Sequence, residues 1–102
     1  MKMVVYCFFS NVQFEGTVKY TIGNPAPFGT IVKVFLNGSL RGQKTLDGTD
    51  GHYAIRGDDE NFPTGSYRLE ADDQIGTFGE VNNVSHTQAP ITEQDIVLNN
   101  AY

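Results

Sequence analysis

Apolar residues occur along this chain in short runs, and clusters of glycine, proline, asparagine and aspartate separate one run from the next. Eleven glycines and four prolines interrupt the sequence too often for an apolar stripe of helical period to persist. Short apolar runs bounded by turn clusters are typical of β-strands. The pattern therefore predicts an all-β protein of seven or eight strands.

Alternation within the runs predicts which side chains point into the core, because successive side chains of a strand face opposite ways. Val32, Val34 and Leu36 share one face of their run, whereas Phe35 lies on the opposite face. We expect strands over residues 3–9, 14–20, 30–36, 39–46, 66–72, 75–81 and 91–98, a further strand around Tyr53 and Ile55, and polar loops over residues 58–61 and 82–90.

Turn chemistry and charge refine this arrangement. Asn37-Gly38 is a type I′ hairpin signal, because both central residues of that turn need a positive φ. Arg41 and Lys44 are charges that discourage edge pairing, so residues 39–46 are expected to be an edge strand. No linker or repeat interrupts the pattern, so residues 1–102 are expected to form one domain. A Greek-key sandwich of two antiparallel sheets would cover the apolar faces that a single sheet would leave exposed.

The N-terminal run from Val4 to Phe9 has two interpretations. Lys2 followed by an apolar run would suit a very short signal peptide, but the run is at the lower limit of length and no small-x-small cleavage site follows it. Aromatic and β-branched residues dominate the run, so we interpret it as the first strand. Cys7 is the only cysteine, which excludes an internal disulfide, and we expect it to act as a small apolar side chain.

The charge balance narrows the classes of partner. Twelve acidic against seven basic residues give a formal net charge of −5, so the chain lacks the basic stripe that binds nucleic-acid phosphates. A polybasic membrane patch is absent for the same reason, and no apolar run approaches the ~20 residues of a membrane-spanning helix. We therefore expect neither nucleic-acid binding nor membrane insertion.

Two glycine turns carry a resemblance to a known family. They are Asp47-Gly48-Thr49-Asp50-Gly51-His52-Tyr53 and Pro63-Thr64-Gly65-Ser66-Tyr67. With the strand segments 15–18 and 29–34, they resemble the carboxypeptidase regulatory-like domains, part of the transthyretin-like (prealbumin-like) group of seven-stranded immunoglobulin-like sandwiches. In that family D-x-x-G-x-[YF] and P-x-G-x-Y turns recur at about this separation, and the match covers residues 14–72. The resemblance implies that Gly51 and Gly65 adopt a positive φ, that Tyr53 and Tyr67 insert between the sheets, and that the domain is an accessory, non-catalytic module.

Two acidic loops supply most of the oxygen ligands for a metal. If both lay at one end of the sandwich, their carboxylates could hold Ca²⁺, which takes about six to eight oxygens. No calcium-loop motif is present and such residues are common in turns, so we expect no metal and no other cofactor. The weak candidates are Asp47, Asp50, Asp58, Asp59 and Glu60. His52 and His86 alone do not make a zinc site, and no nucleophile elbow is present, so the chain is not expected to be an enzyme.

Large apolar side chains that the alternation leaves outside the core predict an interaction surface. The interface candidates are Val5, Phe8, Phe9, Phe35 and Phe78. They favour a non-catalytic structural or protein-interaction module that binds a protein partner or a second copy of itself. Scattered apolar residues are also common on ordinary surfaces. The alternative is a small-ligand or carbohydrate-binding domain that uses loop residues.

The setting of such a module has two interpretations. A chain that starts at its own methionine without a convincing signal peptide would suit synthesis in the cytoplasm and incorporation into a virion, as a phage decoration, neck or tail component. The same module within a longer secreted chain would be a domain of an extracellular surface protein. The sequence does not separate the two.

Overall fold

Nine strands make up the part of the chain that the computed structural model describes, residues 11–87 and 91–102. They are β1 (Asn11–Tyr20), β2 (Ile31–Leu36), β3 (Ser39–Thr45), β4 (His52–Gly57), β5 (Gly65–Asp72), β6 (Thr77–His86), β7 (Thr92–Glu93), β8 (Ile96–Leu98) and β9 (Asn100–Ala101). Within these residues there is no helix, and hence none that could span a membrane. The all-β prediction is confirmed, with nine strands in place of seven or eight.

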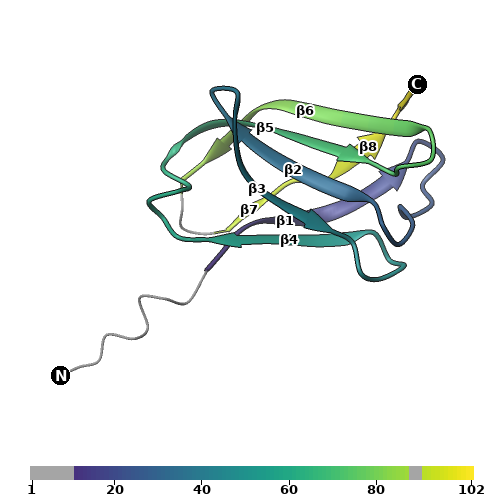
Figure 1. Ribbon diagram of the computed structural model, residues 1–102, viewed down its shortest axis with the longest axis horizontal. Helices are drawn as coiled ribbons and strands as arrows, with labels where there is room; N and C mark the ends of the chain where they lie inside the picture. Colours follow the sequence, from purple (N-terminus) through teal and green to yellow (C-terminus); the bar gives the residue numbers. More distant parts are fainter. Residues whose placement is uncertain (1–10, 88–90) are drawn as a thin grey trace.

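The strands form two sheets that pack face to face (Figure 1). One sheet has the order β4-β1-β7, with β8 also paired to β1, and the other has the order β3-β2-β5-β6-β9. Because β1 pairs with β4 and β2 pairs with β5, the chain crosses repeatedly between the sheets, which confirms the predicted Greek-key sandwich. β3 lies at the edge of the five-stranded sheet, as its charges predict.

The last strands of the four-stranded sheet differ from the expectation of purely antiparallel pairing. β7 and β8 run parallel to β1, whereas β4 is antiparallel to it. The chain enters β7, beside β1, after crossing over from β6 in the other sheet, and a crossover of this kind can deliver a strand in the parallel direction. An interruption at Gln94 and Asp95 divides the predicted strand 91–98 into these two short pieces.

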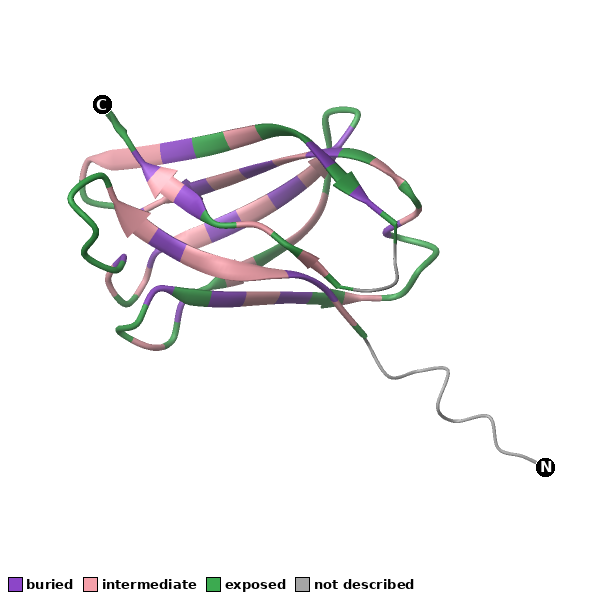
Figure 2. Cartoon of the chain, turned by 180° about the vertical axis from the view of Figure 1, so that it is seen from behind, coloured by how far each residue is buried: buried purple, intermediate pink, exposed green. Residues whose placement is uncertain are grey.

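Buried residues from both sheets form the core between them, and Figure 2 shows buried residues along the strands of both sheets. Burial alternates along β2 and β5, as expected for strands that expose one face. The centroid of the Phe14 ring lies 5.1 Å from that of Tyr67 and 6.0 Å from that of Phe62. Tyr53 and Tyr67 are both buried, which confirms the inward position that the family resemblance implies for them.

The glycine turns follow the prediction in part. Asn37 and Gly38 both have a positive φ, 53° and 83°, as the type I′ hairpin between β2 and β3 requires. Gly51 has a φ of 77°, as expected, and a Cβ there would lie 2.3 Å from the Val18 carbonyl oxygen. The prediction for Gly65 is wrong, because Gly65 pairs with His86 as the first residue of β5 and lies in extended backbone.

β6 is longer than its sequence indicates, and the predicted loop over residues 82–90 is wrong in its first half. Tyr67 pairs with Val84 but Leu69 pairs with Val81, so the two residues between them on β6 form a bulge. Asn83 adopts a φ of 59° in this bulge. The strand then continues with Val84 and His86 buried.

The predicted first strand, from Val4 to Phe9, lies outside the described residues, and so do the interface candidates Val5, Phe8 and Phe9. Cys7 lies there as well.

Candidate binding surface on the five-stranded sheet

The side chains of β2, β5 and β6 that point away from the core form three cross-strand rows. Phe35 is opposite Arg68 in the first row. The second row runs Lys33, Glu70, Glu80 and the third runs Ile31, Asp72, Phe78. We call these eight side chains the outer face: Ile31, Lys33, Phe35, Arg68, Glu70, Asp72, Phe78 and Glu80. The structure therefore places two sequence-predicted interface residues, Phe35 and Phe78, on the same surface.

Arg68 organises the first two rows. Its guanidinium carbon lies 4.4 Å from the centroid of the Phe35 ring. The same guanidinium forms an ion pair with Glu70, and its Nη1 atom lies 3.7 Å from the Glu80 Oε1 atom. Glu70 and Glu80 are directly opposite each other, an unfavourable pairing of like charges that Arg68 offsets. The outer face thus holds a guanidinium between an aromatic ring and two carboxylates.

A hollow of about 260 Å³ lies next to this cluster, around the third row. Tyr102 lies against it, and its ring packs on Phe78 with 4.6 Å between centroids and 36° between the ring planes. The Tyr102 hydroxyl donates to Asp72, and this hydrogen bond raises the pKa of Tyr102. The lining residues include Ile31, Lys33, Glu70, Asp72, Phe78, Glu80 and Tyr102. Sequence reasoning missed Tyr102, because its position depends on the short pairing of β9 with β6.

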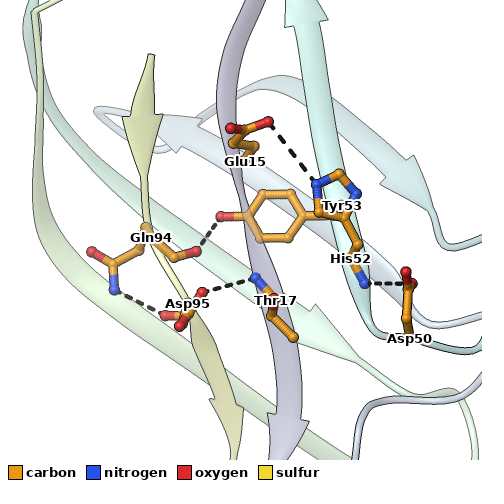
Figure 3. A network of polar contacts seen from close by, with 7 residues as sticks. All are labelled: Glu15, Thr17, Asp50, His52, Tyr53, Gln94 and Asp95. Atoms are coloured by element: carbon orange, nitrogen blue, oxygen red, sulfur yellow. Dashed lines mark hydrogen bonds and ion pairs between the residues drawn. The ribbon is translucent and has the colours of Figure 1, made fainter. Parts of the chain in front are cut away.

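A polar network on the other sheet joins β1 to the interruption between β7 and β8 (Figure 3). The Tyr53 hydroxyl donates to the Gln94 carbonyl oxygen at 2.5 Å. The Thr17 backbone amide donates to the Asp95 Oδ1 atom at 2.9 Å, and the Gln94 backbone amide donates to the Glu15 backbone carbonyl oxygen at 2.8 Å. Burial, with the nearby charge of Asp95, raises the pKa of Tyr53, so the phenol stays protonated as a donor. These contacts hold the chain together where the parallel pairing is broken.

His52 lies at the exposed margin of the same network, on the outward side of β4 as predicted. Its Nε2 atom is 4.0 Å from the Glu15 Oε1 atom, and its backbone amide donates to the Asp50 Oδ1 atom at 3.1 Å. An exposed pair at this separation contributes little to stability. The hydrogen bond between the Asp50 carboxylate and the His52 amide, two residues further along the chain, is one that aspartate commonly makes in turns.

The two acidic loops do not meet, which contradicts the arrangement that a Ca²⁺ site would need. Asp47 and Asp50 precede β4 and Asp58 follows it. Six extended residues separate the two loops by about 20 Å. Within residues 11–87 and 91–102, no three histidine, cysteine, aspartate or glutamate side chains are grouped so that they could hold a metal ion.

The acidic segment after β4 has a structural role instead. The Asp58 Oδ1 atom accepts a hydrogen bond from the Asn61 amide at 2.7 Å, and the Asp59 Oδ1 atom accepts one from the Gln13 side chain at 2.9 Å. This turn carries Phe62 into the core, where it is almost fully buried. A Cβ on Gly57 would lie 2.2 Å from the Phe62 ring, so a glycine there makes room for the ring.

A buried polar chain crosses the same end of the sandwich. His86 is fully buried, and its Nε2 atom lies 2.8 Å from the Gln13 Oε1 atom. Its Nδ1 atom lies 2.7 Å from the Thr92 Oγ1 atom, and its ring stacks on Phe14 at 4.5 Å. Because the Gln13 oxygen only accepts, neutral His86 carries its proton on Nε2. Burial lowers the pKa of His86, although the charge of Asp59 opposes the shift.

The comparisons with known proteins add no family to this picture. No protein-family model matches the sequence, and a search of the curated proteins found no relative. The functional assignment therefore depends on the geometry described above.

Proposed function

We propose that this chain is a non-catalytic structural or protein-interaction module, and that the outer face of its five-stranded sheet binds the partner. The observation that carries the proposal is the position of Phe35 and Phe78. A solvent-facing side of an antiparallel sheet ordinarily carries polar residues. Here it presents two phenylalanines and Ile31, all partly exposed, among charged side chains of both signs. Aromatic residues and arginine are enriched at the centres of protein interfaces.

Three buried titratable groups among the described residues support a non-catalytic role, because each has a structural partner. His86 is hydrogen-bonded on both ring nitrogens. Tyr53 donates to a backbone carbonyl. Asp73 is almost fully buried and accepts hydrogen bonds from the Tyr20 hydroxyl and from the backbone amides of Ile75 and Thr77. Groups committed in this way stabilise the fold rather than present a substrate site.

The proposal extends to the family and the setting. We place the chain among the carboxypeptidase regulatory-like, transthyretin-like domains, supported by the buried tyrosines at the ends of both glycine turns. The first turn has one more residue between Asp47 and Gly51 than the family pattern. As an accessory part, the module would serve as a phage virion decoration, neck or tail component, or as a domain of a surface protein.

The hollow beside Phe78 favours a second candidate, the binding of a small polar group. The loops that sequence reasoning nominated for ligand binding lie at opposite ends of β4 and do not converge. We propose the hollow on the outer face as the place for such a small-ligand or carbohydrate site.

A pair of double variants tests the interaction surface. Phe35→Ser with Phe78→Ser removes the two aromatic side chains of the outer face. Ile22→Ser with Ile75→Ser removes two more exposed apolar side chains, which are 81% and 78% exposed in loops at one end of the sandwich. We expect the first variant to lose the partner that co-purifies with the wild-type chain from its native source, and the second to retain it. Retention of that partner by a folded Phe35→Ser, Phe78→Ser variant would contradict the proposal.

A further inference from the structure

The hollow on the outer face has the size of one side chain. Its volume of about 260 Å³ lies below the range of about 300–1,000 Å³ that holds drug-sized ligands. On that basis, and resting on the proposed function, we propose that the hollow receives the guanidinium group of an arginine side chain presented by the protein partner. Charge, ring geometry and an internal parallel each support this choice.

The charge of the lining favours a cation. The carboxylates of Glu70, Asp72 and Glu80 line the hollow, against the single ammonium of Lys33. Glu70 and Glu80 face each other across β5 and β6, and Arg68 reaches the Glu80 carboxylate only at 3.7 Å. A second cation between these carboxylates would further offset their mutual repulsion. An anionic group in the hollow would instead be repelled by the three carboxylates.

The aromatic lining favours a planar cation. Phe78 and Tyr102 pack against each other at the hollow with their ring planes tilted by 36°, and an aromatic ring attracts a cation placed over its face. A guanidinium stacks on such rings and donates two parallel hydrogen bonds to a carboxylate, whereas an ammonium is a compact and more strongly hydrated charge. The combination of ring and carboxylate therefore selects arginine over lysine.

The same face already holds one guanidinium in this manner. Arg68 lies over the Phe35 ring at 4.4 Å while it pairs with Glu70. Around the third row, Phe78 and Asp72 repeat the pairing of a ring with a carboxylate, on neighbouring strands and directly opposite each other. The hollow thus brings together the same two kinds of group, an aromatic ring and a carboxylate, with the Tyr102 hydroxyl as a further partner of Asp72.

Nuclear magnetic resonance titration of the whole chain tests the inference. The probes are N-acetyl-arginine methylamide and its neutral analogue of the same shape, N-acetyl-citrulline methylamide. We expect the arginine probe to shift the amides of residues 70–72 and 78–80 saturably with a millimolar Kd, and citrulline to cause no saturable shift. Glu80→Gln and Phe78→Leu should each weaken arginine binding at least threefold. Glu60→Gln removes a carboxylate outside the hollow and should leave binding unchanged.

Four results would each overturn the inference: no saturable shift from the arginine probe, equal shifts from citrulline, equal affinity for N-acetyl-lysine methylamide, or unchanged affinity in folded Glu80→Gln. The failure of the proposed function can be recognised separately. If arginine does not bind but the Phe35→Ser, Phe78→Ser variant still loses the partner, the inference fails while the interaction surface stands. If arginine binds and that variant keeps the partner, the surface proposal fails.

Discussion

Substitution of Gly16 by alanine tests how the parallel strands close the four-stranded sheet. A Cβ at this position would lie 2.2 Å from the Gln94 carbonyl oxygen and 2.7 Å from its carbon. Both atoms belong to the backbone, so a side-chain rotation cannot relieve the clash. The segment between β7 and β8 would have to move away, and the same oxygen would then be displaced from the Tyr53 hydroxyl that donates to it at 2.5 Å.

The expected loss of stability follows from these two effects. Overpacking of a tight site costs about 1–3 kcal/mol, and the weakened hydrogen bond adds about 1 kcal/mol. We therefore expect Gly16→Ala to lower the free energy of unfolding by about 3 kcal/mol, a large share of the roughly 5–15 kcal/mol typical of a domain. In a domain of this size that loss corresponds to a Tm lower by about 12–24 °C.

Urea unfolding followed by far-ultraviolet circular dichroism measures this difference. Gly48→Ala is a matched control, because its Cβ would meet no atom closer than the Asp50 Oδ1 atom at 3.5 Å. We expect the control to stay within about 0.5 kcal/mol of the wild type. In a double-mutant cycle, Tyr53→Phe should cost less in the Gly16→Ala background than alone, since the hydrogen bond is already weakened. A Gly16→Ala chain as stable as the control would refute this account of the close approach.

Four further predictions concern buried and partly buried side chains. Burial lowers the pKa of His86, so the unfolded chain takes up a proton at higher pH than the folded one, and the free energy of unfolding should fall as the pH drops below about 6.5. A series of urea midpoints in which His86→Gln shows the same dependence on pH as the wild type would contradict this. Asp73→Ala leaves three hydrogen-bond donors without their acceptor and should lower the free energy of unfolding by about 3 kcal/mol in urea, against about 1 kcal/mol for Tyr20→Phe. Equal losses in the two variants would show that the Asp73 carboxylate does not hold the turn between β5 and β6 together. The hydrogen bond to Asp73 raises the pKa of Tyr20 to about 12, and absorbance titration should show a phenol of lower pKa in Asp73→Asn. Phe62→Ala should lower the unfolding free energy by about 3–5 kcal/mol, and a loss under about 1 kcal/mol would show that Phe62 is not a core residue.

The parts of the fold that could be predicted depend on local rules. The pattern predicts Val32 and Val34 in the core, where they lie, because strict alternation operates wherever one face of a strand is buried. The Asn37-Gly38 hairpin was predictable because few residue pairs adopt two successive positive φ angles. The same alternation predicts that Phe35 points away from the core, and Phe35 lies on the outer face.

The parts that could not be predicted depend on distant partners. Asn82 and Asn83 read as a loop, because a bulge in mid-strand resembles a turn in sequence. His86 is polar but buried, and only its hydrogen bonds to Gln13 and Thr92 make that burial favourable. The parallel pairing of β7 and β8 with β1 depends on a crossover between sheets, which no local pattern encodes. The prediction of a positive φ at Gly65 is wrong because its motif resembles a positive-φ turn, whereas the backbone there is extended.

Site-specific photo-crosslinking in the native source tests the central claim, that the outer face binds the partner, most directly. A photoreactive phenylalanine analogue would replace Phe35, Phe78 or, as the control, Ala54 on the outward side of β4 in the other sheet. We predict that Phe35 and Phe78 both yield one crosslinked product of the same mass, and that Ala54 does not. Equal yields from all three positions, or a product from Ala54 alone, would contradict the assignment of the outer face as the binding surface.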